Sequence, residues 1–428
     1  MPKIAFHTLG CKLNFAESSD LLRRFKNEGF EEADFQDKAD VYVINTCTVT
    51  AVAEKKCRNA IRQAHRMNPH SLIAVIGCFA QVNASEIAKI EGVNIILGND
   101  NKHLLIDKVK QWSAEKELQN FVKDISRLHT FYSSYSSADR TRGFLKVQDG
   151  CDYFCTYCEI PFARGRSRSC RIEDAVRDAG ELALAGKKEV VLTGVNIGDF
   201  GKGTDEDFLS LIRELDKQTA VERYRISSIE PDLLTKEIID FCASSRAFMP
   251  HFHIPLQAGS DKVLQMMNRR YGVEHFKEKV LYIKEKMPQA FVACDVMTGF
   301  NGETQEEFDK ACLFLESLPI AFIHVFTYSE RPDARAVKLH ERVPMEERRK
   351  RSEILQNLAL KKKKEFYKQN ISLLTSVLWE ENEKDGKMYG FTENYIRVST
   401  PFDAAKTNTT EKIRLTNLSS DGECFEIV

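Results

Sequence analysis

Three cysteines close together in the sequence are the residues of this chain best suited to carry chemistry. Cys151, Cys155 and Cys158 form a CxxxCxxC pattern, and Tyr157 directly precedes the last of them. A [4Fe–4S] cluster usually takes four thiolates, so three cysteines on one loop can hold a cluster and leave one iron open for chemistry. The alternative is structural zinc, which prefers a fourth Cys or His at short spacing. The next cysteine, Cys170, lies further along the chain, behind a basic stretch.

Three more cysteines each follow a short apolar run near the N-terminus. The runs predict strands at 4–9, 41–46 and 72–77, alternating with helical segments near 17–29, 51–66 and 83–90. This alternation predicts a parallel, doubly wound α/β sheet. Ligands of such a sheet bind at the carboxyl ends of its strands. Cys11, Cys47 and Cys78 lie at these ends, so they form a second candidate metal site. The alternative is three unrelated buried cysteines. Cys57 lies in a predicted helix, does not share the strand-end position and is expected to be an ordinary helix residue.

The middle of the chain alternates strand and helix six times and predicts an open (βα)6 partial barrel. The predicted strands lie near 143–149, 188–194, 223–230, 251–257, 290–298 and 321–328. Chemistry in such barrels sits at the carboxyl ends of the strands, where small and polar residues gather. With Tyr157 of the loop, the candidate cofactor-binding residues are Gly194, Asn196, Ser228, Glu230, Gln257, Asp295, Thr298, Gly299 and Tyr328. Each could equally be an ordinary turn residue, since such turns are rich in these types.

Length and composition indicate a globular enzyme with several domains. At 428 residues the chain exceeds the usual size of a single core. We expect an N-terminal domain over 1–125, a linker over 126–142, a barrel domain over 143–370 and a small C-terminal domain over 371–428. The formal net charge is −1, so any nucleic-acid surface must be local. Twelve cysteines without a secretory signal or a membrane span predict a cytoplasmic protein with metal-bound or reduced thiols.

Local basicity appears before and within the C-terminal part. Arg348–Arg351 and Lys361–Lys364 lie on a predicted helix, and several β-type runs over 371–428 predict a small β-barrel. Basic surface with exposed aromatics, such as Tyr395, is typical of nucleic-acid binding. The alternatives are a solvated helix face and a domain that caps the central barrel. Arg164–Arg168 could meet RNA phosphate or a cofactor carboxylate, or be solvated.

The motifs resemble those of a known family. CxxxCxxC is the hallmark of the radical S-adenosylmethionine superfamily, and the whole chain resembles its methylthiotransferase branch. The matching strings begin at Thr8, Asn45, Gly77, Arg225, Ile254 and Gly299. The sequence around Cys47 is most similar to the enzymes acting on N6-threonylcarbamoyladenosine at tRNA position 37, whereas relatives act on isopentenyladenosine or on a ribosomal-protein aspartate. Asn301 stands where the family commonly has proline, and residues 390–396 resemble the TRAM module of RNA-modifying enzymes.

The resemblance implies the cofactors and partners. Two [4Fe–4S] clusters would bind, one at each cysteine triad, with S-adenosylmethionine on the open iron of the loop cluster. Reductive cleavage would give a 5′-deoxyadenosyl radical, and the strand-end cluster would supply the methylated sulfur. Glu230 and Asp295 would hold S-adenosylmethionine, while His251 and His253 are expected to pack. The implied partners are tRNA, an electron donor such as a flavodoxin or ferredoxin, and a sulfur donor, with no membrane. A non-catalytic electron carrier and a tRNA-binding scaffold remain alternatives.

Overall fold

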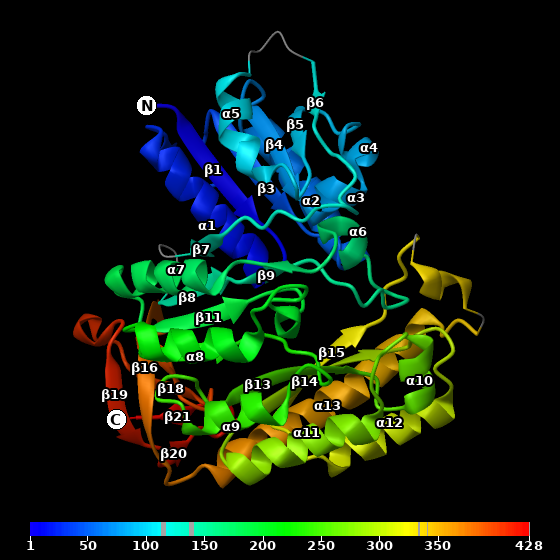
Figure 1. The fold of residues 1–428 in the computed structure, drawn as a ribbon, viewed down its shortest axis with the longest axis vertical. Helices are drawn as coiled ribbons and strands as arrows, with labels where there is room; N and C mark the ends of the chain where they lie inside the picture. Colours follow the sequence, from blue (N-terminus) through cyan, green and yellow to red (C-terminus); the bar gives the residue numbers. More distant parts are fainter. Residues whose placement is uncertain (113–116, 137–140, 333, 340, 428) are drawn as a thin grey trace.

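The computed structural model describes residues 1–112, 117–136, 141–332, 334–339 and 341–427. Figure 1 shows an N-terminal α/β unit above a central sheet wrapped by helices, with the C-terminal strands packed beside the lower end of that sheet. Residues 137–140 of the expected linker lie outside the described residues. Within the described part of the chain, no helix is both long enough and apolar enough to cross a membrane.

The N-terminal unit is a parallel sheet with the strand order β2-β1-β3-β4-β5-β6. Its strands are β1 (Lys3–Thr8), β2 (Glu31–Glu32), β3 (Val41–Thr46), β4 (Leu72–Gly77), β5 (Val93–Leu97) and β6 (Gln119–Asn120). Its helices are α1 (Lys12–Asn27), α2 (Ala51–Met67), α3 (Cys78–Val82), α4 (Ala84–Ile87) and α5 (Leu105–Lys110). Strands β3 and β4 are buried along their whole length, which suits apolar runs covered by helices on both faces.

The expected strands of this unit are present, but two helices differ from expectation. Helix α1 begins at Lys12, directly after Cys11, and not near residue 17. The helix expected over 83–90 is only the short α4, and an unexpected helix, α3, precedes it and ends before Asn83. As a result Cys78 is the first residue of a helix, at the carboxyl end of β4.

Six parallel strands form the central barrel, in the order β8-β11-β12-β13-β14-β15, with β12 and β13 joined by isolated bridges. They are β8 (Arg142–Lys146), β11 (Glu189–Thr193), β12 (Arg223–Ile226), β13 (His251–Gln257), β14 (Phe291–Thr298) and β15 (Phe322–Thr327). Strand β7 (Ser134–Ser136) adds antiparallel to β8, so this part of the expected linker belongs to the sheet. Two short strands, β9 (Gln148–Asp149) and β10 (Arg168–Ser169), pair beside the barrel mouth.

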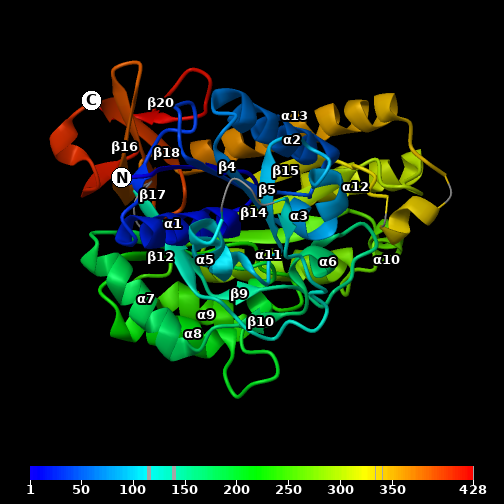
Figure 2. The ribbon, with the colours of Figure 1, turned by 90° about the horizontal axis from the view of Figure 1, so that it is seen from above.

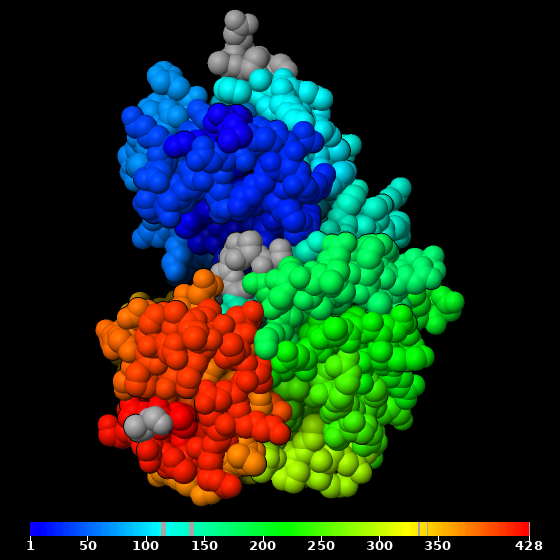
Figure 3. Space-filling view, turned by 90° about the vertical axis from the view of Figure 1, so that its left-hand side faces the viewer, coloured from blue at the N-terminus to red at the C-terminus, as the bar shows by residue number. Residues whose placement is uncertain are grey.

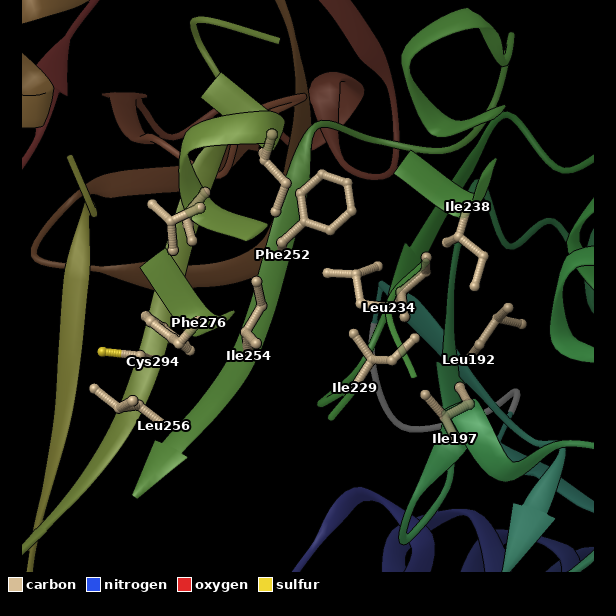
Figure 4. Close-up of a cluster of buried hydrophobic side chains, with 14 of the residues drawn as sticks. Leu192, Ile197, Ile229, Leu234, Ile238, Phe252, Ile254, Leu256, Phe276 and Cys294 are labelled. Atoms are coloured by element: carbon tan, nitrogen blue, oxygen red, sulfur yellow. The ribbon is translucent and has the colours of Figure 1, made fainter. Parts of the chain in front are cut away.

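Helices cover the outside of the barrel sheet. They are α7 (Ile172–Leu184), α8 (Phe208–Gln218), α9 (Lys236–Ser244), α10 (Asp261–Met266), α11 (Val273–Lys286), α12 (Gln305–Ser317) and α13 (Met345–Gln369). The short helix α6 (Ile160–Arg164) instead packs against α3 of the N-terminal unit (Figure 1). Figure 4 shows the buried core between them and the sheet, with Phe252, Ile254 and Leu256 of β13 among its members. Because side chains alternate along a strand, His251 and His253 lie on the opposite, inner face.

The C-terminal part is a curled six-stranded sheet with the order β19-β16-β17-β18-β21-β20. Its strands are β16 (Leu374–Lys384), β17 (Lys387–Thr392), β18 (Arg397–Pro401), β19 (Thr410–Arg414), β20 (Asn417–Leu418) and β21 (Phe425–Glu426). Phe291, Ala293 and Ala321 of the barrel belong to the same core as the fully buried Trp379. Figure 3 shows this sheet, in orange and red, packed directly against the green barrel.

Candidate active site

The loop cysteines, Cys151, Cys155 and Cys158, follow β8 and β9 at the barrel mouth. The loop curls tightly, because Phe154 has a φ of +51° and Cys158 N donates to Cys155 O at 3.1 Å. The Tyr153 amide donates to Cys151 Sγ at 3.5 Å. Burial raises the pKa of the Cys151 thiol to about 12, so its thiolate needs a compensating cation. A bound metal cluster supplies that charge, and the donor set of three sulfurs on one curled loop fits it.

Arg269 connects this loop to one of the predicted cofactor residues. Its Nη1 donates to Cys155 Sγ at 3.2 Å, and its Nη2 forms an ion pair with the Glu230 carboxylate. Burial raises the pKa of Glu230 to about 7, although Arg269 opposes that shift. Glu230 therefore lies beside the loop cysteines, as expected. Arg269 was missed, because its partners lie 114 and 39 residues away in the sequence.

The strand-end cysteines, Cys11, Cys47 and Cys78, come together at one edge of the N-terminal sheet. Burial, followed by the nearby Cys78 and Cys11 thiols, raises the pKa of Cys47 to about 12. The turns that bring them together need glycine: a Cβ on Gly10 would lie 3.1 Å from Cys47 Sγ, and one on Gly77 would lie 2.5 Å from Thr46 O. The thiolate forms of these three cysteines would repel one another, and a bound metal cluster would supply the positive charge that offsets this repulsion.

Two neighbours complete the strand-end site. Asn14 Nδ2 donates to Leu9 O at 2.7 Å and to Thr46 O at 3.1 Å, so it ties the ends of β1 and β3 together. Cys57, expected to lie apart on its helix, instead packs against Cys47: its Sγ accepts from Cys47 N at 3.4 Å. It is fully buried. The sequence spacing did not predict this contact of Cys57, because it forms only when α2 folds back over the end of β3.

A cavity of about 240 Å³ lies between the loop cysteines, the N-terminal unit and the barrel mouth. Its lining includes four of the predicted cofactor residues together with Cys158: Tyr157, Gln257, Asp295 and Tyr328. Thr48, Val49 and Thr50 close it from the N-terminal unit, and Phe326 lines it from β15 with 51% of its surface exposed. The cavity thus joins both halves of the candidate site, and sequence reasoning missed Phe326 and the Thr48–Thr50 segment.

Arg331 holds the two halves together beside this cavity. Its Nη2 contacts Thr48 Oγ1 at 3.0 Å and forms an ion pair with Glu54, and its Nε lies 3.1 Å from Glu159. Glu159 directly follows Cys158, so one arginine connects β15, the cysteine loop and α2. These contacts therefore hold the residues on this side of the cavity in fixed positions.

The inner face of the barrel beside the cavity carries a polar group. His253 Nε2 donates to Asp295 Oδ1 at 2.7 Å, and the His324 ring lies 4.9 Å from that of His253. Burial, followed by His253, lowers the pKa of His324. The expectation that His253 merely packs is wrong, because it orients the Asp295 carboxylate at the cavity. His251, in contrast, packs against Phe291 and Tyr395 as expected.

The remaining predicted cofactor residues lie around the cavity without lining it. Gly194 and Asn196 surround Gln148, whose Oε1 accepts from Asn196 N at 2.9 Å, and Ser228 bridges to His253. Thr298 turns away from the cavity toward α13, where its Oγ1 lies 2.6 Å from Ser352 Oγ. Thr298 as a cofactor contact is therefore not supported by its orientation.

Gly299 and Asn301 pack against α13 through one arginine. A Cβ on Gly299 would lie 2.2 Å from Arg348 Cγ, so packing explains this glycine. Asn301 Oδ1 accepts from Arg348 Nη2 at 3.4 Å, and its Nδ2 donates to Ala336 O at 3.1 Å. These hydrogen bonds fix the loop where the family commonly has proline.

Two arginines of the predicted basic loop, Arg164 and Arg168, are buried between the two units, whereas Arg166 is exposed and lies 3.5 Å from Asp152. Arg164, with 1% of its surface exposed, contacts Asp149 at 2.9 Å, Glu17 at 3.1 Å and Asn14 at 2.6 Å. Arg168 contacts Asp149 at 3.0 Å. For these two arginines, the predictions of a phosphate contact, a cofactor-carboxylate contact and a solvated charge are therefore wrong. Arg164 fastens α1 to the barrel, and Arg168 holds Asp149 beside it.

The C-terminal basic helix is also paired internally. Arg348 contacts Glu330 at 2.9 Å, and Arg351 contacts Glu303 at 2.8 Å. Lys361 pairs with Glu316 at 2.9 Å, and Lys362 donates to two backbone carbonyls. Neither a free phosphate-binding surface nor a simple solvated face describes this helix.

Tyr395 lies under the barrel and not on an outer surface. Its hydroxyl accepts from Arg142 Nη1 at 3.1 Å, and its ring lies 4.5 Å from that of His251. Arg223 and Arg225 donate to backbone carbonyls of the C-terminal sheet. The capping alternative for this part of the chain is thus supported by direct contacts, and truncation at Asn370 would uncover the barrel.

Comparisons with known proteins agree with this site. The model of the Radical SAM superfamily matches residues 145–315, and that of the uncharacterized protein family UPF0004 matches residues 3–98. A solved radical S-adenosylmethionine methyltransferase, TsrM from Kitasatospora setae, shares the fold with a TM-score of 0.57 at 14% identity, over 76% of this chain and 75% of that one. The barrel and its cysteine loop define a radical S-adenosylmethionine enzyme.

Two curated relatives give the particular family. The threonylcarbamoyladenosine tRNA methylthiotransferase MtaB of Bacillus subtilis is 39% identical over 93% of this chain and 90% of its own length. The protein of the same name from Aquifex aeolicus is 38% identical over 92% of this chain and 96% of its own length. The chain belongs to this methylthiotransferase family. Membership implies S-adenosylmethionine and [4Fe–4S] clusters as cofactors.

Proposed function

We propose that this enzyme converts N6-threonylcarbamoyladenosine at position 37 of tRNA to its 2-methylthio derivative. The observation that supports it most is the single cavity shared by the loop cysteines and the N-terminal segment that follows Cys47. A sulfur transferase needs its radical source and its sulfur source to reach one substrate atom. The names of the curated relatives supply the tRNA nucleoside.

The cysteine triads would hold the two clusters: the loop cysteines the one that cleaves S-adenosylmethionine, and the strand-end cysteines the one that supplies sulfur. Tyr157, Gln257 and Asp295 would position the cofactor and the adenine in the cavity. Asp295 keeps its orientation through His253. Glu230 would accept hydrogen bonds from the cofactor, with Arg269 fixing its carboxylate. An electron donor of the flavodoxin or ferredoxin type and a separate sulfur donor are needed for turnover.

Mass spectrometry of tRNA nucleosides tests the proposal. Cells lacking this protein should accumulate N6-threonylcarbamoyladenosine and lose its 2-methylthio form, and the wild-type gene should restore it. A matched strain carrying a variant with alanine at the loop cysteines should remain deficient. Loss of the isopentenyladenosine product would instead assign the enzyme to that sister activity, and unchanged nucleosides would exclude tRNA as the substrate.

The C-terminal sheet is a second element of this proposal. Its resemblance to the TRAM module supports a contribution to RNA binding in addition to its contacts with the barrel. Domain boundaries near 125 and 370 remain part of the proposal, whereas the boundary expected at 142 falls inside the barrel sheet, because β7 pairs with β8.

A further inference from the structure

The outer face of α2 carries a concentration of unpaired positive charge. The helix holds five basic side chains, Lys55, Lys56, Arg58, Arg62 and Arg66, against one carboxylate, Glu54. Lys55, Lys56, Arg62 and Arg66 are exposed. Within the part of the chain that the structure describes, the side chains of these four residues form no ion pair and no hydrogen bond. On α13, by contrast, five of the nine Lys and Arg side chains form ion pairs with carboxylates, including Arg351 with Glu303 and Lys361 with Glu316.

Three of these arginines form a continuous stripe. Arg58, Arg62 and Arg66 are four residues apart and line a shallow groove of about 520 Å³ together with Lys89. Two carboxylates, Glu86 and Glu91, also line the groove, and Glu86 lies 3.5 Å from Arg58. Four cations against two carboxylates leave the groove with a net positive charge.

Helix α2, which carries the stripe, starts at the candidate active site. Thr48–Thr50, which line the cavity, lead directly into α2, and Ala51 N donates to Ser329 Oγ at 3.4 Å across the cavity rim. From Ala51 to Arg66 the helix extends roughly 22 Å at about 1.5 Å per residue. Val49 and Val52, 60% and 64% exposed, lie at the end nearest the cavity.

We propose that this face of α2 binds the phosphate backbone of the tRNA whose base enters the cavity. The inference rests on the proposed function and deepens it by assigning the surface that holds the substrate. Arginines four residues apart are about 6 Å apart along the helix axis, close to the spacing of successive phosphates on one strand. A nucleotide in the cavity continues into flanking backbone at its rim, where α2 begins. Binding of an acidic protein would not require the cations to lie in a line that leads away from the cavity.

Salt dependence of tRNA binding tests the assignment. The test variant is Arg62→Gln with Arg66→Gln, in the reconstituted full-length enzyme. The matched control is Arg213→Gln with Lys217→Gln on α8, two exposed cations at the same four-residue spacing. Figure 2 shows α8 on the opposite side of the molecule from α2. Thermal unfolding checks that both variants are folded.

Loss of two phosphate contacts should flatten the log–log salt slope by about 1.8, since each contact contributes about 0.9. Between 50 and 200 mM salt, the wild-type affinity for tRNA should then fall about 12-fold more than that of the α2 variant. The α8 variant should keep the wild-type slope. Fluorescence anisotropy with labelled tRNA gives both quantities.

Three results would overturn the inference. One is an α2 variant with the wild-type slope, and another is an α8 variant with an equal loss of slope, which would mean diffuse electrostatics. The third is unchanged tRNA binding with slower reduction by a flavodoxin, which would make the face a docking site for an acidic protein. A wild-type enzyme that binds no tRNA would instead overturn the proposed function itself.

Discussion

Replacing Glu17 with glutamine should weaken the junction between the N-terminal unit and the barrel. Its carboxylate contacts Lys102 at 2.5 Å, Lys146 at 2.9 Å and Arg164 at 3.1 Å, and all three cations are buried. Asp149 alone would then balance the buried cations around it. Breaking a buried pair by removing one partner costs about 3–5 kcal/mol, because a charge stays buried without compensation.

The expected loss is measurable as a shift in Tm. Unfolding entropy is about 2.1 cal/mol/K per residue, so cooperative unfolding of the 428-residue chain gives about 0.9 kcal/mol/K. A loss of about 4 kcal/mol then lowers Tm by roughly 4 °C, and by more if the N-terminal unit separates first. Differential scanning calorimetry and urea titration at pH 7 provide the two measurements.

The same prediction has a pH dependence with a fixed sign. Burial alone would raise the pKa of Glu17, but Arg164, Lys102 and Lys146 outweigh it and hold the pKa well below its usual value. The stabilisation is therefore complete above the unfolded-state pKa of about 4.3 and is lost as the pH falls through the lower native pKa. The stability difference between wild type and variant should be full at pH 7 and shrink below about pH 4.3.

Glu28→Gln is the matched control. Glu28 also pairs with a lysine, Lys110, but both side chains are nearly half exposed, at 46% and 44%. Exposed pairs are worth about 0–1 kcal/mol. If Glu17→Gln destabilised the enzyme no more than Glu28→Gln, or if its effect were the same at pH 3 and pH 7, the account of the junction would be refuted.

Three further changes test the site. Replacing all loop cysteines with alanine should leave half of about eight irons and abolish S-adenosylmethionine cleavage. Replacing the strand-end cysteines with alanine should preserve cleavage and stop sulfur transfer. A full iron load in either variant would contradict the assignment of the cluster ligands. Phe326→Ala should weaken tRNA binding about 5- to 150-fold if the ring stacks on a base. The control is Phe402→Ala, because the Phe402 side chain is 38% exposed on the C-terminal sheet and should not affect tRNA binding. Equal effects of the two substitutions would count against stacking. Tyr395→Phe removes the hydrogen bond from Arg142 and should cost about 0.5–1.5 kcal/mol of stability without changing tRNA affinity, and a loss of affinity alone would place Tyr395 on the RNA surface.

Much of the fold follows from local sequence patterns. The apolar runs that end at Cys47 and Cys78 give fully buried strands, and the six barrel strands recur where apolar segments alternate with helices. The position of the cysteines follows from topology, since parallel strands carry their carboxyl ends to one edge. Four of the predicted cofactor residues line one cavity for the same reason.

The partners of the charged residues could not be predicted in this way. Arg164 contacts Asn14 across 150 residues of sequence, and Arg331 contacts Glu54 across 277. No local periodicity encodes such a pairing, because it depends on how the N-terminal unit sits on the barrel. The orientation of Thr298 toward α13 likewise depends on a helix that begins 47 residues later.

The density of basic residues is for this reason a poor guide to the RNA surface. The run Lys361–Lys364 is one of the most basic segments of the sequence, yet Lys361 pairs with the Glu316 carboxylate and Lys362 donates to the carbonyls of Glu316 and Leu318. The less conspicuous α2 keeps four free cations, because the only carboxylate on it, Glu54, faces inward to Arg331. Burying that carboxylate fastens α2 to the barrel and at the same time removes the negative charge from its outer face. The ion pair between Glu54 and Arg331 therefore fixes one side of the cavity and leaves the exposed face of α2 positively charged.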